Sequence, residues 1–219
     1  ALPNTRRVSV AIIGSRRPTA YGEEVTHRLA ADLSRYGVVI ISGLALGVDA
    51  IAHTACLDTG GTTIAVMANG LHRIYPSSHT GLAKQITEHG GAVITEQEAG
   101  YEAKPYDFLA RNRLVSGLAD AVVVTEATQK SGTLSTVAHA LAQNKEVFAV
   151  PGPITSLLSA GPNKLLQQGA HVALRAEDIL QIIAPELLDV KTTRQTRLVL
   201  GDTPAETAII SLIQKGTRD

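Results

Sequence analysis

Short apolar runs rich in β-branched residues recur along the chain, and stretches with helical patterning separate them. Several runs are apolar throughout, which is typical of strands that are covered on both faces of a sheet. Strand–helix alternation at this spacing predicts an α/β fold with a mostly parallel, doubly wound sheet and helices on both faces. The expected strands span residues 8–13, 38–41, 62–67, 92–95, 121–124, 146–150 and 171–174.

The same patterning divides the chain into a core domain and a short C-terminal appendage. Between the first two expected strands, Leu29 and Leu33 belong to a helical apolar stripe, and Gly37 follows where a helix C-cap belongs. Strand–helix alternation stops near residue 185. We therefore expect one core domain over residues 1–185, and a polar linker with one short amphipathic helix over residues 186–219.

Composition restricts the partners that the chain can bind. Lys plus Arg and Asp plus Glu both number 20, so the formal net charge is zero and a polyanion would need a local basic patch. Two phenylalanines and no tryptophan disfavour single-strand binding on rows of aromatic stacking platforms.

Cysteine and histidine usage gives no sign of a disulfide or a metal site. The lone Cys56 suits a reducing cytoplasm, and no apolar stretch is long enough for a signal peptide or a membrane span. The seven histidines are scattered without metal-binding spacing. Neither a GxGxxG fingerprint nor a Walker A loop is present, so we expect no metal and no standard nucleotide cofactor.

Four unusual segments follow expected strands, at residues 14–19, 42–53, 68–76 and 125–136. In open α/β sheets, ligands bind beyond the carboxyl ends of the strands. Four such segments at one sheet edge predict a binding site there.

The first of these segments offers groups that suit an anion. Gly14 lets a ligand approach the backbone, Ser15 can donate a hydrogen bond, and Arg16 can hold a phosphate in a fork. The alternative is an ordinary β–α turn in which Arg16 and Arg17 are solvated.

The last segment runs from a buried strand through a small polar loop into a helix start, a layout that can hold a phosphate. The loop contains Lys130, Ser131 and Gly132, and Ser131 or Thr133 is a plausible N-cap. Plain capping chemistry beside a solvated lysine is the alternative.

The second segment carries Gly43 and Gly47 around a turn, followed by Asp49 and His53 on one helix face. Asp49 could orient a ligand or position His53. It could instead stabilise the helix N-terminus and pair with a buried His53. No third ligand or nucleophile completes a catalytic group, which favours the second interpretation.

Residues 108–120 predict a helix with an apolar stripe that includes Phe108 and Leu118. Arg111 lies on that stripe, so its charge needs a partner, which could be a carboxylate such as Asp49 or Glu126, or a ligand phosphate. Arg113 points nearly the opposite way and is by default a solvated surface charge.

Taken together, these motifs resemble the DprA/Smf family, the DNA-processing proteins of bacterial natural transformation. The resemblance extends from about Val10 to Ile183 and rests on AIIGSRRPTAYG, VIISGLALGVDAIAH, GLHRIYP, RNRLVSGLAD, KSGTLST and VFAVPGPITSLLSAGPNKLLQQGA. It implies an extended Rossmann-like fold without known catalysis. The implied partners are single-stranded DNA, held in a basic pocket, the recombinase RecA and a second copy of the chain. The DNA- or phosphate-binding residues would be Gly14, Ser15, Arg16, Arg17, Gly43, Arg111, Asn112, Arg113, Lys130, Ser131, Gly132 and Thr133.

The sequence also departs from the pattern of this family. Residues 68–72 read Ala-Asn-Gly-Leu-His, where relatives often have Gly-Thr-Gly-Leu-Asp. Many relatives carry an N-terminal helical domain and a C-terminal winged helix, and residues 204–216 resemble only the first helix of the latter.

An enzymatic alternative comes from the loop at Gly132, which is similar to the glycine-rich loop of LOG-like nucleotide phosphoribohydrolases. In that family a glutamate follows the loop shortly after its Gly-Thr, whereas here Gly132 and Thr133 precede Leu-Ser-Thr-Val. The missing acid counts against hydrolysis. A nucleotide-sensing module is the third possibility.

Overall fold

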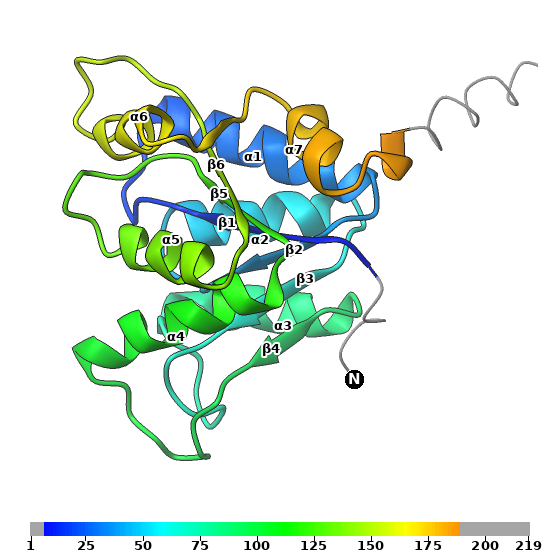
Figure 1. Cartoon of the computed structure of the whole chain (residues 1–219). Helices are drawn as coiled ribbons and strands as arrows, with labels where there is room; N and C mark the ends of the chain where they lie inside the picture. The colour runs from blue at the N-terminus through cyan, green and yellow to red at the C-terminus, as the bar shows by residue number, and fades with distance from the viewer. Residues whose placement is uncertain (1–6, 189–219) are drawn as a thin grey trace, which may run out of the picture.

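The computed structural model describes residues 7–188 and contains a seven-stranded, wholly parallel sheet (Figure 1). All seven expected strands are present, which confirms the α/β fold with its doubly wound sheet. The expected linker and terminal helix lie almost wholly outside the described residues. The strands are β1 (Ser9–Ile13), β2 (Val39–Ser42), β3 (Thr63–Val66), β4 (Ala92–Ile94), β5 (Ala121–Val124), β6 (Glu146–Ala149) and β7 (His171–Val172).

The strand order is β4-β3-β2-β1-β5-β6-β7. The chain therefore starts at the centre, builds outward to β4, and then crosses back to place β5 on the other side of β1. The crossing makes a topological switch point between β1 and β5, the place where doubly wound sheets bind their ligands.

The helices form one layer on each side of the sheet (Figure 1). They are α1 (Ala20–Arg35), α2 (Val48–Asp58), α3 (Thr80–Glu88), α4 (Pro105–Leu118), α5 (Thr133–Ala142), α6 (Ala160–Gln167) and α7 (Ala176–Ile183), with a 3₁₀ turn at Ser77–His79. α1, α2 and α7 share one core cluster, while α4, α5 and α6 contribute to the other. None of the helices within residues 7–188 is both long and apolar enough to cross a membrane.

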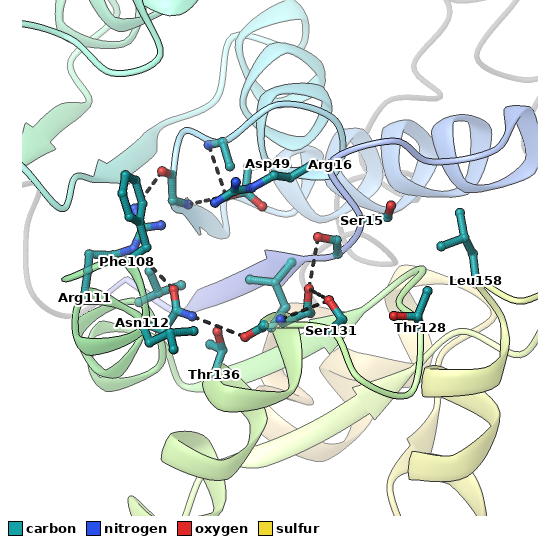
Figure 2. Close-up of a pocket in the computed structure, with 18 residues that line it drawn as sticks. Ser15, Arg16, Asp49, Phe108, Arg111, Asn112, Thr128, Ser131, Thr136 and Leu158 are labelled. Atoms are coloured by element: carbon teal, nitrogen blue, oxygen red, sulfur yellow. Dashed lines mark hydrogen bonds between the residues drawn. The ribbon is translucent and has the colours of Figure 1, made fainter. Parts of the chain in front are cut away.

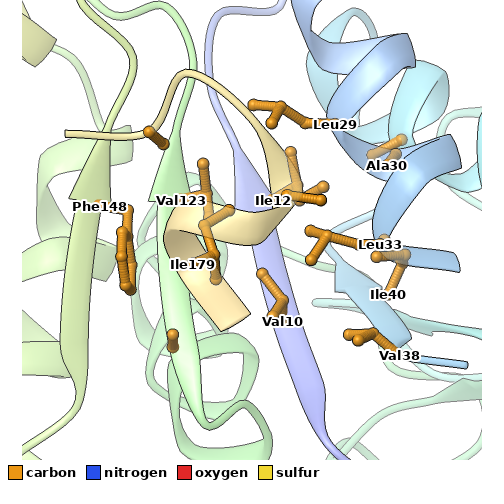
Figure 3. Close-up of a cluster of buried hydrophobic side chains, with 14 of the residues drawn as sticks. Val10, Ile12, Leu29, Ala30, Leu33, Val38, Ile40, Val123, Phe148 and Ile179 are labelled. Atoms are coloured by element: carbon orange, nitrogen blue, oxygen red, sulfur yellow. The ribbon is translucent and has the colours of Figure 1, made fainter. Parts of the chain in front are cut away.

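β1 contributes to both core clusters, because its successive side chains point to opposite faces. Val10 and Ile12 pack with Leu29 and Leu33 of α1 (Figure 3). Ile13 packs on the other face, and all five of these side chains are buried. Burial of each large apolar side chain stabilises the fold by about 1.5–3 kcal/mol, which explains why β1 is apolar from Val10 to Ile13.

The start of α1 is fixed to the end of β5 through a buried carboxylate. Thr19 Oγ1 accepts a hydrogen bond from the Gly22 N–H at 3.2 Å and donates to Glu126 at 2.7 Å. The Thr19 N–H also donates to Glu126, at 2.8 Å. Glu126 therefore has a structural role and is not the partner of Arg111. At the other end of α1, Gly37 has a φ of +81°, as expected for a residue that follows a helix C-cap.

The two buried polar side chains of α2 do not pair with each other, so the expected contact between Asp49 and His53 is wrong. The Asp49 carboxylate accepts from the Gly43 N–H at 3.0 Å. His53 Nδ1 lies 2.6 Å from Thr63 Oγ1, whose hydroxyl donates to the Ile40 carbonyl at 2.7 Å. The hydroxyl must then accept from His53, which places the proton on Nδ1 and leaves the buried Nε2 without a partner.

Substitution by alanine should change the free energy of unfolding in opposite directions at two helical glycines. A Cβ at Gly161 of α6 would lie 2.5 Å from the Ala127 carbonyl oxygen, whereas a Cβ at Gly81 of α3 has no atom within 4 Å. Gly161→Ala should lower the free energy of unfolding by about 1–3 kcal/mol through overpacking. Gly81→Ala should raise it by about 0.5 kcal/mol because alanine favours the helix. Urea unfolding of both variants measures this, and equal effects would contradict the tight packing of α6.

The free energy of unfolding should decrease at acidic pH because His53 is buried in its neutral form. Burial lowers its pKa from 6.5 to about 3, helped by His79 and Arg111. The unfolded chain therefore binds a proton that the folded chain excludes, so the stabilisation is complete above pH 6.5 and is lost as the pH falls toward 3. The slope from this group is on the order of 1 kcal/mol per pH unit. Urea unfolding across this range should show a shallower slope for His53→Gln, and parallel profiles would contradict a buried neutral histidine.

Candidate functional site

A pocket of about 460 Å³ opens at the carboxyl edge of the sheet, at the switch point (Figure 2). The loops after β1, β2 and β5 form its walls together with the middle of α4, residues 108–115. Three of the four segments singled out in the sequence therefore converge as expected. The fourth, residues 68–76, does not line this pocket and instead lines a smaller cavity beside it.

The pocket gathers nine of the twelve predicted site residues. These are Gly14, Ser15, Arg16, Gly43, Arg111, Asn112, Ser131, Gly132 and Thr133. Arg17, Arg113 and Lys130 are exposed and are not among the lining residues. Arg17 and Lys130 are close in sequence to lining residues, whereas Arg113 forms an ion pair with Glu96 outside the pocket.

The loop between β5 and α5 is fixed by hydroxyl groups. Gly132 occupies the N-cap position, rather than Ser131 or Thr133 as expected. Ser131 Oγ nevertheless accepts from the Thr133 N–H at 3.2 Å, and Thr133 Oγ1 donates to the Gly14 carbonyl at 3.1 Å. Within the described residues, the Gly132 N–H has no hydrogen-bond acceptor. The start of α5 thus presents a free N–H and a partial positive charge to the pocket.

The loop after β1 is packed too tightly for any residue but glycine at its start. A Cβ at Gly14 would lie 2.7 Å from the Val48 side chain and 2.9 Å from the Glu126 carbonyl oxygen. The Ser15 N–H donates to that same carbonyl at 2.7 Å, and the Ser15 carbonyl accepts from the Val48 N–H at 3.1 Å. These contacts fix the backbone from which Arg16 extends into the pocket.

The guanidinium of Arg16 lies over the ring of Phe108, 5.8 Å from its centroid. Arg16 itself is exposed and has no carboxylate partner among the described residues. A ring that supports a guanidinium leaves its N–H groups available to an anion. Arg16 is therefore the cation best placed to meet a ligand in the pocket.

Arg111 is buried, and its partners are two backbone carbonyls and the amide oxygen of Asn112, which accepts from Nε at 3.3 Å. It donates to the Gly43 oxygen at 2.7 Å and also to the Val66 oxygen. Burial lowers the pKa of Arg111, and the nearby Asp49 raises it. Asp49 lies close enough to interact with this charge without a direct ion pair, so the expected carboxylate partner acts only at longer range.

Asp49 is the only acid among the described residues that line the pocket. Its carboxylate accepts from the N–H groups of Gly43 and Ala45, at 3.0 and 3.3 Å. Burial raises the pKa of Asp49, while Arg111 and these backbone N–H groups lower it. This carboxylate is thus engaged in holding the loop after β2.

Arg113 faces away from the pocket, as its position opposite Arg111 predicted. It forms an ion pair with Glu96 on the surface, and its carbonyl accepts from Gln143 at 3.0 Å. The expected apolar stripe of α4 is partly wrong, because Leu118 is 40% exposed while Val115 is buried. Asn112, between the two arginines, donates to Ser135 Oγ at 2.9 Å and so connects α4 to α5.

Sequence reasoning missed several lining residues. The helical pattern places Phe108 in the core stripe, but the side chain forms a partly exposed wall of the pocket. The feature that could have identified it is its rarity, since the chain has only two phenylalanines. Leu158 reaches the pocket because the loop after β6 folds back, where the Ala127 N–H donates to the Leu158 carbonyl at 2.7 Å. No local sequence pattern predicts such a contact. The other missed lining residues are Ile13, Ala45, Leu109, Val115, Thr128 and Thr136.

The assembled groups suit the binding of an anion more than covalent chemistry. The pocket combines the start of α5, the Arg16 guanidinium and small hydroxyl residues. No described group of three His, Cys, Asp or Glu side chains could hold a metal ion. An anion with a planar organic group would meet both the donors and the ring of Phe108.

Curated relatives match most of this chain. Protein Smf of Escherichia coli is 44% identical over 172 residues, which cover 78% of this chain and 46% of that protein. DNA processing protein DprA of Bacillus subtilis is 41% identical over 172 residues, covering 78% of this chain and 58% of that protein. This chain thus spans about half the length of these relatives.

Solved structures agree with this relationship. DNA processing protein A from Streptococcus pneumoniae superposes with a TM-score of 0.75 at 36% identity, covering 82% of this chain and 62% of that one. A Helicobacter pylori DNA processing protein A, studied for its single-stranded DNA binding mode, gives 0.70 at 36% identity and covers 84% of this chain and 81% of its own. A molybdenum cofactor binding protein from Rippkaea orientalis, with a TM-score of 0.57 at 20% identity, shares only the fold.

A family model described as DNA recombination-mediator protein A matches residues 1–184, which is the whole of the sheet and both helical layers. The sequence match, the structural match and the pocket at the switch point all concern the same part of the chain. The chain belongs to the DprA/Smf family of DNA processing proteins.

Proposed function

We propose that this chain binds single-stranded DNA by holding its backbone phosphate in the pocket at the switch point. The observation that carries the proposal is that one pocket is lined both by Gly132, whose N–H is unpaired at the start of α5, and by Arg16, whose guanidinium is exposed. A phosphate between them would meet both a helix N-terminus and a forked cation. The single-stranded DNA binding named for the Helicobacter pylori relative supports the same assignment.

The predicted site residues divide by role under this proposal. Ser15, Arg16 and Gly132 contact the phosphate, and Gly14 lets it approach the backbone. The scaffold consists of Gly43, Arg111, Asn112, Ser131 and Thr133, whose hydrogen bonds hold the loops in place. Arg17 and Lys130, exposed outside the pocket, attract the phosphates on either side. Arg113 takes part only if Glu96 releases it.

The wider role that we propose follows the resemblance to the family. In the cytoplasm of a transformable bacterium, the chain protects incoming single strands, acts as a homodimer and transfers the DNA to the recombinase RecA. It carries out no catalysis. This chain spans about half the length of its curated relatives, so these activities are proposed from the family relationship and not from the pocket.

Hydrolysis of a nucleotide is the rival function, since the pocket could also hold one nucleoside monophosphate. Cleavage of an N-glycosidic bond needs a carboxylate near the sugar. The only acid among the described lining residues is Asp49, whose carboxylate is held by two backbone N–H groups. Release of free base from a nucleoside monophosphate would favour the enzyme, and tight mononucleotide binding without cleavage would favour a sensor.

Fluorescence anisotropy with a labelled oligothymidylate at several salt concentrations tests the proposal. We expect salt-sensitive binding that duplex DNA and a mononucleotide displace poorly. Absence of binding at low salt, or displacement by a mononucleotide at micromolar concentration, would overturn it.

Substitutions of Arg16 and Lys130 should have different effects on DNA binding, because Arg16 lines the pocket and Lys130 does not. Arg16→Gln should weaken binding of every oligonucleotide and reduce the salt slope by about one unit, since one phosphate contact is lost. Lys130→Gln should reduce the slope only for strands that extend beyond the pocket. The measurement is the anisotropy titration repeated with short and long oligothymidylates.

Arg35→Gln provides the matched control for both variants. Arg35 pairs with Asp32 in the last turn of α1, away from the end that carries the pocket loop, so the same charge is removed without effect on the slope. A slope that falls equally in all three variants would show that net charge alone governs binding, and the pocket would then be misplaced.

Transfer to a recombinase predicts an effect on filament formation. RecA should start to hydrolyse ATP sooner on DNA coated with single-strand-binding protein when this chain is present. With Arg16→Gln, ATP hydrolysis should again begin only after a long lag, because the chain must capture the strand before it transfers it. In a separate measurement, light scattering should give twice the mass of one chain if the dimer forms. An unchanged lag would remove recombinase loading from the proposal while leaving DNA binding intact.

A further inference from the structure

A second cavity of about 180 Å³ adjoins the main pocket, and the ring of Phe108 lies between the two. Phe108 lines both spaces. The other walls of the second cavity come from the segment after β3, with Asn69, Arg73 and Tyr75, and from Glu102 and the residues before α4. This is where the fourth sequence segment, residues 68–76, reaches the same sheet edge.

Two aromatic side chains line this second cavity. They are Tyr75 and Phe108, in a chain that has only five tyrosines and two phenylalanines. The Tyr75 and Phe108 rings lie 5.4 Å apart between centroids and are tilted by 54°. The Arg16 guanidinium lies over the same Phe108 ring, so Phe108 contacts a cation of the main pocket and an aromatic ring of the second cavity.

The polar groups of the second cavity have no net charge. Arg73 forms an ion pair with Glu102 at 2.7 Å. The buried amide of Asn69 donates through Nδ2 to the carbonyls of Gly70 and Arg73, at 3.0 and 2.9 Å. Within the described residues its amide oxygen has no donor and stays available as an acceptor. Balanced donors and acceptors beside aromatic rings suit a nucleobase, whereas a phosphate needs uncompensated positive charge.

We propose that this cavity is a second nucleotide subsite, which takes the base of the nucleotide adjacent to the one whose phosphate lies at the start of α5. Tyr75 and Phe108 form its stacking surface, and Asn69 with the Arg73–Glu102 pair contacts the edge of the base. The inference rests on the proposed function, since a strand must first enter the main pocket. It makes the binding unit of one chain at least two nucleotides long.

The test compares a 5′-phosphorylated thymidine mononucleotide with the dinucleotide and trinucleotide as competitors of the labelled strand. Wild type should bind the dinucleotide more tightly than the mononucleotide. Tyr75→Leu keeps the apolar volume and removes the ring, so it should weaken dinucleotide binding by roughly tenfold, the contribution of one base stacked on an aromatic side chain. Its affinity for the mononucleotide should equal that of wild type.

Tyr106→Leu is the matched control. Tyr106 lies two residues from Phe108, is 59% exposed and lines neither cavity, so the same substitution there should leave both affinities unchanged. A measurement on the unaltered protein complements the variants. 2-Aminopurine as the second base of the dinucleotide should lose fluorescence on binding, because stacking on an aromatic ring quenches it.

The outcomes separate the two proposals. If the dinucleotide and mononucleotide bind wild type equally, or if Tyr75→Leu weakens both to the same extent, the subsite is wrong while phosphate capture stands. An unquenched 2-aminopurine that binds also overturns the subsite. If no oligonucleotide binds at low salt, the proposed function and the subsite fail together.

Discussion

The guanidinium of Arg111 lies inside the protein, where it donates to the carbonyls of Gly43 and Val66 at the ends of β2 and β3. A charge in this position holds α4 against the carboxyl edge of the sheet. It also leaves no room for a side chain at Gly43 unless the guanidinium moves, since a Cβ there would lie 2.6 Å from it. One wall of the pocket, from the loop after β2 to the first turns of α4, depends on this interaction.

Such a burial is costly unless the charge is compensated. Asp49 provides the compensation at a distance, and its own carboxylate is held by the backbone N–H groups of Gly43 and Ala45. Each charge makes the burial of the other tolerable, because each opposes the pKa shift that desolvation imposes on its neighbour. The acid and the histidine four residues apart, for which the sequence favours a structural role over a ligand-binding one, are thus part of the scaffold.

The fold could be predicted from the sequence because apolar runs such as residues 121–124 report directly which strands are covered on both faces. Much of the site followed, since Gly14, Ser131 and their neighbours lie at strand ends that the topology must bring together. The partner of His53 could not be predicted, because it depends on which hydroxyl the packing of α2 places beside the ring. Leu158 and the surface pairing of Arg113 depend likewise on contacts between segments far apart in the sequence.

A chain with no net charge can still attract a polyanion if its acids are paired and its unpaired positive charge lies at the binding site. Here the acid of the pocket is fixed to the backbone and other acids are paired, as Glu96 is with Arg113 and Glu102 with Arg73. Arg16 lies beside an aromatic ring and has no carboxylate partner within residues 7–188, and the start of α5 adds a partial positive charge that a count of charged residues does not include. Groups arranged in this way can stabilise a bound phosphate, and the capture of a strand proposed above depends on that property.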